Sequence, residues 1–154
     1  MKRRLRTQDL LRSYDLTNND PLVCPLCGRQ PDSHDHLFFS CSYSMQVWSS
    51  LTRFAGFSSL PSSLDDITHT LIVSVKSRSV RSVVSKLLFA AASYFIWQER
   101  NNRIFKKMRR TEAQVEDIIK STVRLKLLTC RFKKTANVID LVHVWKFSPS
   151  LIHP

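Results

Sequence analysis

The stretch that decides the fold is residues 24–41, CPLCGRQPDSHDHLFFSC. Its thiols and one of its histidines follow the spacing C-x2-C-x8-H-x4-C. A Cys-x2-Cys turn points two thiolates at one ion, and a histidine with a third cysteine completes a tetrahedral set suited to zinc. The spacing therefore predicts a zinc site whose four ligands are Cys24, Cys27, His36 and Cys41. Because protein atoms fill all four positions, the site is predicted to be structural.

Two alternatives stay open on spacing alone. His34 lies close to His36 in sequence and could supply the fourth ligand in a slipped set. The cysteines could also be ordinary buried thiols beside a surface histidine. The grouping of four ligand-type residues within one 18-residue stretch disfavours this second interpretation.

The residues next to the ligands agree with a metal site. Gly28 follows the second cysteine, where such a turn often needs a positive φ, and the chain has only two glycines. Helically spaced apolar residues predict a helix over Ser42–Phe54 that ends near Gly56. Cys41 would lie at its start, where the helix dipole favours a thiolate.

Further helices are expected on both sides of this segment. Apolar residues between Leu5 and Tyr14 suggest a short leading helix, and residues 64–75 are ambiguous between helix and strand. A long helix is predicted from about Ser79 to Lys107, with a broad apolar stripe. Thr111 and Gln114 form a capping-box pattern that opens another helix. The inner face of that helix is predicted to contain Val115, Ile118, Ile119, Leu125, Leu128 and Phe132.

The predicted fold is mainly α: a small helical domain with an irregular zinc-ligating loop, followed by a helical hairpin. The predicted organisation is a zinc-binding domain with flanking helices at 1–57, a linker or short helix at 58–78, and a basic helical region at 79–154. Residues 137–147 within the last region are a short helix or strand. Because so small a unit lacks a large core, zinc is expected to be needed for order in residues 1–57.

The charge balance favours a polyanionic partner. The chain has 24 Lys and Arg against 12 Asp and Glu, a formal net charge of +12. Nucleic acid, with RNA favoured over DNA, is the expected partner, although a basic surface can also serve solubility. The candidate phosphate contacts are Arg3, Arg4, Arg6, Arg100, Arg103, Lys106, Lys107, Lys120, Arg124 and Arg131, any of which could instead belong to a solvated face.

The N-terminus predicts an intracellular protein. Its basic residues are followed by no apolar core of a signal peptide, and the basic cluster at 106–110 is a loose nuclear-localisation pattern. The apolar stretch Leu87–Trp97 is shorter than the roughly 20 residues that span a bilayer. Neither a membrane nor a small-molecule substrate is therefore expected as a partner.

The segment from about Arg6 to Trp48 resembles the reverse transcriptase zinc-binding domain of plant LINE-type, non-LTR retrotransposons. That family has a leucine-rich helix, a cysteine pair, His-Leu-Phe-Phe-x-Cys and a downstream Val-Trp. The matching segments here are Thr7–Arg12 (TQDLLR), Cys24–Gly28 (CPLCG), His36–Cys41 (HLFFSC) and Val47–Trp48. A weaker similarity links Ile96–Phe105 (IWQERNNRIF) to the Trp-x-x-Arg-Asn stretch that follows this domain in related plant reading frames.

The resemblance implies roles for particular residues. Cys24, Cys27, His36 and Cys41 would be the zinc ligands, and the residues packed around them would be Leu37, Phe38, Val47 and Trp48. Asp32-Ser33 replaces a Glu-Ser/Thr step that is common before the histidine, a change that leaves the ligands untouched. The resemblance also implies a reverse transcriptase core as a possible partner.

Catalysis by this chain alone is not expected. No Tyr-x-Asp-Asp-like segment is present to hold the metal ions of a polymerase. Glu112, Glu116 and Asp117 could be RNase H-type ligands, but their place at a predicted helix start favours dipole stabilisation. Three hypotheses follow: an RNA-binding module in which Phe38 or Phe39 stacks on bases, a helical protein-interaction module, and a non-functional remnant of a transposable element.

Overall fold

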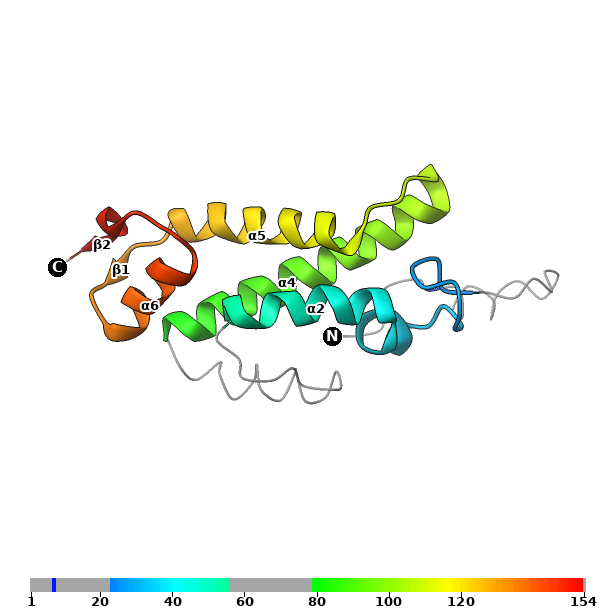
Figure 1. The fold of residues 1–154 in the computed structure, drawn as a ribbon, viewed down its shortest axis with the longest axis horizontal. Helices are drawn as coiled ribbons and strands as arrows, with labels where there is room; N and C mark the ends of the chain where they lie inside the picture. The colour runs from blue at the N-terminus through cyan, green and yellow to red at the C-terminus, as the bar shows by residue number, and fades with distance from the viewer. Residues whose placement is uncertain (1–6, 8–22, 56–78, 154) are drawn as a thin grey trace.

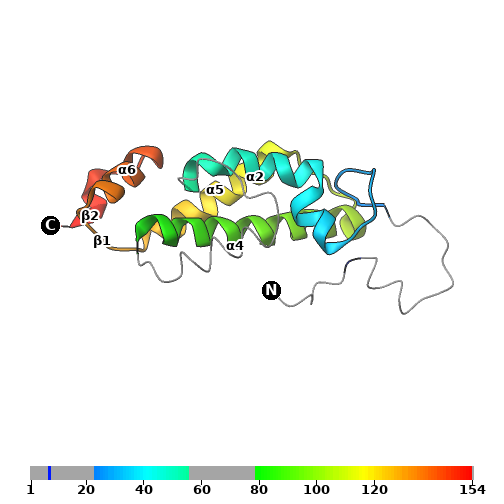
Figure 2. The ribbon, with the colours of Figure 1, turned by 90° about the horizontal axis from the view of Figure 1, so that it is seen from below.

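A computed structural model describes residue 7 and residues 23–55 and 79–153. Its main elements are the helices α2 (Ser42–Ala55), α4 (Val80–Asn101) and α5 (Glu112–Leu128), which pack lengthwise against one another (Figure 1). The short helix α6 (Ala136–Val144) lies at one end of this bundle, and the cysteine loop lies at the other (Figure 2). The mainly α class is confirmed. The predicted leading helix and residues 58–78 lie outside the described residues.

Helix α4 is the central helix of the bundle. It begins at the predicted place, where the Ser79 side chain accepts a hydrogen bond from the amide of Ser82 at 3.3 Å. Its inner stripe repeats every four residues and is fully buried: Val84, Leu88, Ala92 and Ile96. The helix continues into a π-helical turn, η2 (Asn102–Lys106), and Lys107 then ends it in the left-handed region at φ 52°.

By length and hydropathy, the segment Val80–Lys106 is apolar enough to cross a membrane. Within the described residues, however, this segment packs against α2, α5 and α6. The buried Glu99 and Arg100 belong to it as well. The core helix of a globular bundle has the same composition, so this property alone indicates no membrane partner.

Helix α5 begins with the predicted capping box, in which Thr111 and Gln114 each accept a hydrogen bond from the other's backbone amide. Its buried residues are Val115, Ile119, Val123 and Leu127. Placing Leu125 on the inner face was wrong, since its side chain is 67% exposed, and Leu128 is exposed too. The buried stripe repeats every four residues, which turns both positions toward solvent.

The chain after α5 folds back over the end of the bundle. Phe132 does not extend α5 but forms, with Lys133, the strand β1 (Phe132–Lys133), which pairs in parallel with β2 (Ile152–His153). Between them, the segment 137–147, predicted as a helix or strand, is helical up to Val144 as part of α6, which has Thr135 as its N-cap. The short 3₁₀ turn η3 (Pro149–Leu151) then leads into β2.

One hydrophobic core joins the regions predicted as separate units. Val47 and Leu51 of α2 belong to the same buried cluster as Leu88 of α4, Ile119 of α5 and Trp145 after α6. The described part of the zinc-binding region therefore packs directly on the basic C-terminal helices. Its stability is expected to be linked to theirs.

Candidate metal centre

The first two cysteines lie on a tight turn. The amide of Gly28 donates to the Cys24 carbonyl at 2.8 Å, and the amide of Cys24 donates to the Gln30 carbonyl at 2.7 Å. Gly28 has the predicted positive φ, 66°. The backbone amides of Leu26 and Cys27 also act on the Cys24 sulfur in the direction that lowers its pKa. This is the turn geometry in which two thiolates face one ion while amides stabilise their charge.

The other two candidate ligands flank a π-helical turn, η1 (His36–Ser40). The amide of Cys41 donates to the His36 carbonyl at 2.7 Å, a hydrogen bond that spans five residues. A π turn has more residues than an α turn, so side chains five positions apart lie on the same face. Cys41 also immediately precedes α2, and its carbonyl accepts from the Met45 amide at 2.8 Å, as predicted for a helix start.

The four candidate side chains converge on one point. Their ligand atoms lie within 4.8 Å of one another. Cys24 Sγ and Cys41 Sγ are 3.9 Å apart, and Cys27 Sγ is 3.2 Å from His36 Nε2. A tetrahedral zinc with bonds of about 2.3 Å to sulfur and about 2.0 Å to nitrogen separates its ligand atoms by roughly 3.5–3.8 Å. The two distances above lie within about 0.3 Å of this range, and a set of three sulfurs and one nitrogen within 4.8 Å needs only small side-chain shifts to bind zinc.

The structure brings His36, and not His34, to the sulfurs. The His34 ring is buried and packs on Phe38, with the ring centroids 5.0 Å apart. Cys130 lies after α5, where its sulfur contacts the Lys126 carbonyl, and it takes no part in the cluster. The slipped ligand set is thus disfavoured by the geometry.

The cluster is already disposed to lose a proton. The hydrogen bond with Cys24, supported by amides of Ser44 and Tyr43 at the start of α2, lowers the pKa of Cys41 to about 5. The same hydrogen bond and burial raise the pKa of Cys24. Zinc binding would displace the proton that this sulfur pair retains, because both sulfurs bind the metal as thiolates.

The residues predicted to pack around the ligands belong to the core cluster that also contains Cys24 and Cys41. Leu37, Phe38, Val47 and Trp48 are all buried in the core cluster. Trp48 Nε1 donates to the Phe38 carbonyl at 2.9 Å, and Ser44 Oγ donates to the Leu37 carbonyl. Because Ser44 and Trp48 belong to α2, their hydrogen bonds to carbonyls of the π turn hold that turn against the helix.

Arg103 connects the cysteine turn to the C-terminal helices. Its Nη1 donates to the carbonyls of Pro25 at 3.1 Å and Leu26 at 2.9 Å, both between the first two cysteines. Its Nε donates to the buried Glu99 carboxylate at 2.8 Å, and its guanidinium lies over the Tyr43 ring. The turn is therefore fixed from outside by a residue of η2.

A second connection is a buried ion pair. Arg100 is 2% exposed, and its guanidinium hydrogen-bonds to the fully buried Asp32 carboxylate, which precedes η1. The next residue, Ser33, accepts a hydrogen bond from the His36 amide at 3.2 Å. The Asp-Ser step thus has two structural roles, although it contains no ligand.

These interactions change the set of candidate phosphate contacts. Arg100 and Arg103 are occupied within the protein, so the structure does not support them as phosphate contacts. Lys120 forms ion pairs with Glu116 and Asp117, and Arg124 donates to the carbonyls of Trp145 and Lys146. The exposed members of the set are Lys106, Lys107 and Arg131. The other members, Arg3, Arg4 and Arg6, lie outside the described residues.

Sequence reasoning missed Asp32, Glu99 and Tyr43 as supports of the site. Tyr43 Oη donates to the Arg110 carbonyl at 3.0 Å, and the Glu99 carboxylate accepts from the Arg110 amide at 2.8 Å. Burial, and then the charge of Glu99, raises the pKa of Tyr43. One signal was present: Glu99 and Arg100 interrupt the apolar pattern of α4, and buried charges of this kind occur paired.

The fold and the cluster define a structural zinc-binding module on a helical bundle. Comparison with known families agrees: residues 1–48 match the family described as zinc-binding in reverse transcriptase. The match supports a reverse transcriptase zinc-binding domain at this end of the chain, which is a metal-binding domain and not a catalytic one. No curated protein and no solved structure matches the chain.

Gly28→Ala is expected to lower the free energy of unfolding of the zinc-loaded protein by about 1 kcal/mol. A Cβ at this position meets no atom within 4 Å, so the cost arises from the left-handed φ alone. Gly28→Asn should cost less, because asparagine tolerates this region better. Urea denaturation of the three proteins measures the order. Equal stability of all three would contradict the role given to the positive φ.

Proposed function

We propose that the chain is a zinc-stabilised, non-catalytic module that binds nucleic acid, RNA in the first place, and derives from the C-terminal part of a plant LINE-type retrotransposon reverse transcriptase. The family match and the zinc-suited cluster support the metal-binding part. The basic charge of the chain supports a polyanionic ligand. Such a module would act inside the cell, with the nucleus as the expected compartment.

The observation that favours nucleic acid most is an exposed segment at the end of η2 and in the connection to α5, residues 105–109, which we call the tip. Phe105 is 75% exposed and Met108 52% exposed, between the exposed cations Lys106, Lys107 and Arg109. The sequence from Arg100 to Thr111 contains no acidic residue. An exposed aromatic ring among cations offers a stacking surface for an unpaired base and charges for its phosphates.

The tip is held near the zinc cluster by the polar contacts of Arg103. This side chain donates both to the Leu26 carbonyl of the cysteine turn and to the Arg110 carbonyl that follows the tip, each at 2.9 Å. Zinc would therefore act on the binding surface indirectly, by ordering the turn that Arg103 holds. Of the two predicted stacking residues, Phe38 is buried and the side chain of Phe39 lies outside the described part of the structure, so we propose Phe105 as the stacking residue.

A protein-interaction module is the second candidate. Two helices could dock on a partner, the apolar stretch Leu87–Trp97 and the amphipathic helix after Thr111, but the first uses its most buried residues inside the bundle. The exposed Leu125 and Leu128 of α5 favour a docking face on that helix instead, for example toward a polymerase core. Apolar docking depends little on salt, whereas phosphate contacts weaken steeply as salt rises.

Lys106→Gln/Lys107→Gln is expected to weaken binding of a fluorescein-labelled oligouridylate and to flatten its salt dependence. The slope of log K against log salt is negative, and its magnitude should decrease by about 0.7 for each lysine–phosphate ion pair that the substitutions remove. Phe105→Ser should weaken binding by roughly 1–3 kcal/mol without changing the slope, because stacking releases few counterions. Fluorescence anisotropy across a salt series measures both effects on the zinc-loaded chain.

The matched control is Lys133→Gln/Lys134→Gln, an exposed lysine pair beyond the other end of α5. It makes the same change of net charge away from the tip and should leave the slope nearly intact. Binding that ignores salt, or an equal effect of both lysine pairs, would count against the tip as the contact surface.

A further inference from the structure

We propose that a second nucleic-acid contact lies at the end of the bundle away from the zinc cluster: a basic cleft that receives one nucleotide unit of a single strand. The cleft lies between α2, α5 and the turn that follows α6. This inference rests on the proposed function and adds to it a specific site for one phosphate and one unpaired base.

The cleft has the size and lining of a small-ligand site. Its volume is about 560 Å³, within the range of roughly 300–1,000 Å³ common for such sites. Its lining residues are Arg53, Phe54, Lys120, Ser121, Arg124, Val144, Trp145 and Lys146. Four of these are cations, two are aromatic and none is acidic, so the lining is complementary to an anion with an aromatic part.

The four cations are not equivalent. Arg124 donates to the Trp145 and Lys146 carbonyls, and Lys120 is paired with Glu116 and Asp117, so both are already engaged within the protein. Arg53 and Lys146 are exposed and form no ion pair among the described residues, although the Arg53 guanidinium lies over the Phe54 ring, 4.8 Å from its centroid. These two side chains are therefore available for a phosphate at the mouth of the cleft.

Lys146 has an unusual backbone conformation. Its φ is 50°, where it ends α6 with the Phe147 amide donating to the Val142 carbonyl at 2.9 Å. Glycine is the residue that takes this helix-ending position without strain. A lysine there places a charge at the cleft at a conformational cost, and strain of this kind concentrates at binding sites.

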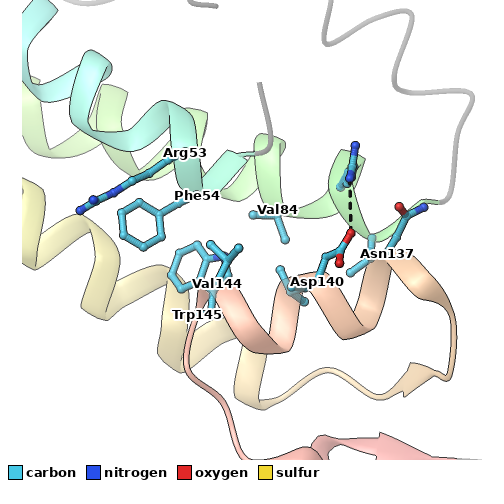
Figure 3. Close-up of a pocket in the computed structure, with 10 residues that line it drawn as sticks. Arg53, Phe54, Val84, Asn137, Asp140, Val144 and Trp145 are labelled. Carbon is cyan, nitrogen blue, oxygen red and sulfur yellow. Dashed lines mark ion pairs between the residues drawn. The ribbon is translucent and has the colours of Figure 1, made fainter. Parts of the chain in front are cut away.

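The aromatic side of the cleft lies next to these cations. Phe54 of α2 and Trp145 face each other edge to face with their centroids 5.3 Å apart. Figure 3 shows them in the smaller neighbouring hollow, which shares Arg53, Phe54, Val144 and Trp145 with the cleft. The Trp145 Nε1 donor is buried and has no hydrogen-bond partner among the described residues. A ligand with an acceptor could satisfy it.

A nucleotide in a single strand fits this combination. Its phosphate would contact Arg53 and Lys146, and its base would stack on the Arg53 guanidinium, which covers the half-buried Phe54 ring. In a duplex the base would be stacked and paired, so it could not enter the cleft. An acidic peptide would use the charges but leave the aromatic side unmatched.

The test compares two double charge reversals in the zinc-loaded chain. Arg53→Glu/Lys146→Glu reverses the free cations of the cleft, and Lys126→Glu/Lys133→Glu makes the same charge change at exposed lysines that do not line it. Affinity for a fluorescein-labelled oligouridylate should fall about tenfold or more in the first variant and by less than about fivefold in the second.

Tryptophan fluorescence tests the site itself. Titration with the unlabelled oligouridylate should quench the emission, and Trp145→Phe should remove most of the quenching while Trp48 and Trp97 remain. Phe54→Leu, which preserves apolar bulk, should weaken binding about fivefold or more even if Trp145→Phe does not fold.

The outcomes separate this inference from the proposed function. Oligouridylate binding that is equal in the two charge-reversal variants, with quenching unchanged by Trp145→Phe, overturns the cleft but leaves nucleic-acid binding intact. Absence of oligouridylate binding by the unmodified chain overturns both. Stronger binding of a duplex than of the single strand overturns the cleft, because a paired base cannot enter it.

Discussion

Cys27→Ser is expected to reduce the zinc content from about one ion per chain to none and to unfold the cysteine loop with η1. Removing one ligand from a closed tetrahedral site removes most of the binding free energy, and in small zinc modules that free energy is also folding free energy, about 10–16 kcal/mol. This is the largest effect we expect from any single substitution in the chain.

The unfolding should extend beyond the loop. Cys41 lies at the N-terminus of α2, and α2 supplies Val47 and Leu51 to the core shared with α4 and α5. Loss of the metal should therefore lower the helical circular dichroism signal and the melting temperature of the whole described bundle. Elemental analysis of protein purified without added metal, together with a thermal melt, measures both.

Cys130→Ser is the matched control, because it makes the same chemical change at a half-buried thiol outside the cluster. It should retain about one zinc ion and a nearly unchanged melt. An unmodified chain without zinc would remove the basis of the proposed function. The ligand pattern would then survive only as a relic of a transposable element.

Arg100→Met is expected to lower the free energy of unfolding by about 3–5 kcal/mol. The substitution leaves the fully buried Asp32 carboxylate without its guanidinium, and a buried charge that loses its partner is strongly destabilising. Methionine retains most of the apolar volume, so the loss measures charge more than packing. Urea denaturation of the zinc-loaded chain gives the value.

Two comparisons make this result specific. Arg81→Met breaks the exposed ion pair with Asp140, 3.7 Å long, and should cost about 0–1 kcal/mol. Adding Asp32→Asn to Arg100→Met should recover part of the loss, because it removes the buried charge. Equal effects of Arg81→Met and Arg100→Met would show that the buried pair contributes no more than a surface pair.

Local patterns in the sequence predicted local structure well. Ser79 at the start of α4, the Thr111 capping box and the positive φ of Gly28 depend on residues within one or two turns of each other. Phe132 was assigned to a helix wrongly because its parallel pairing with Ile152 depends on a segment 20 residues away. The exposure of Leu125 likewise depended on where the other helices lie.

The sequence by itself determined the helical class and the three cysteine ligands, which fall with two candidate histidines in one short stretch, whereas the structure was needed to place His36 rather than His34 at the sulfurs. Only the tertiary structure decided what the charges do. Arg100 reaches Asp32 across 68 residues of sequence, and burial fixes that pair inside the protein. Lys106, Lys107 and Lys146 remain in solvent. Charged residues look alike in the sequence whether they are buried or exposed. Only the distances from the charge to a partner and to water decide whether it stabilises the fold or is available to a ligand.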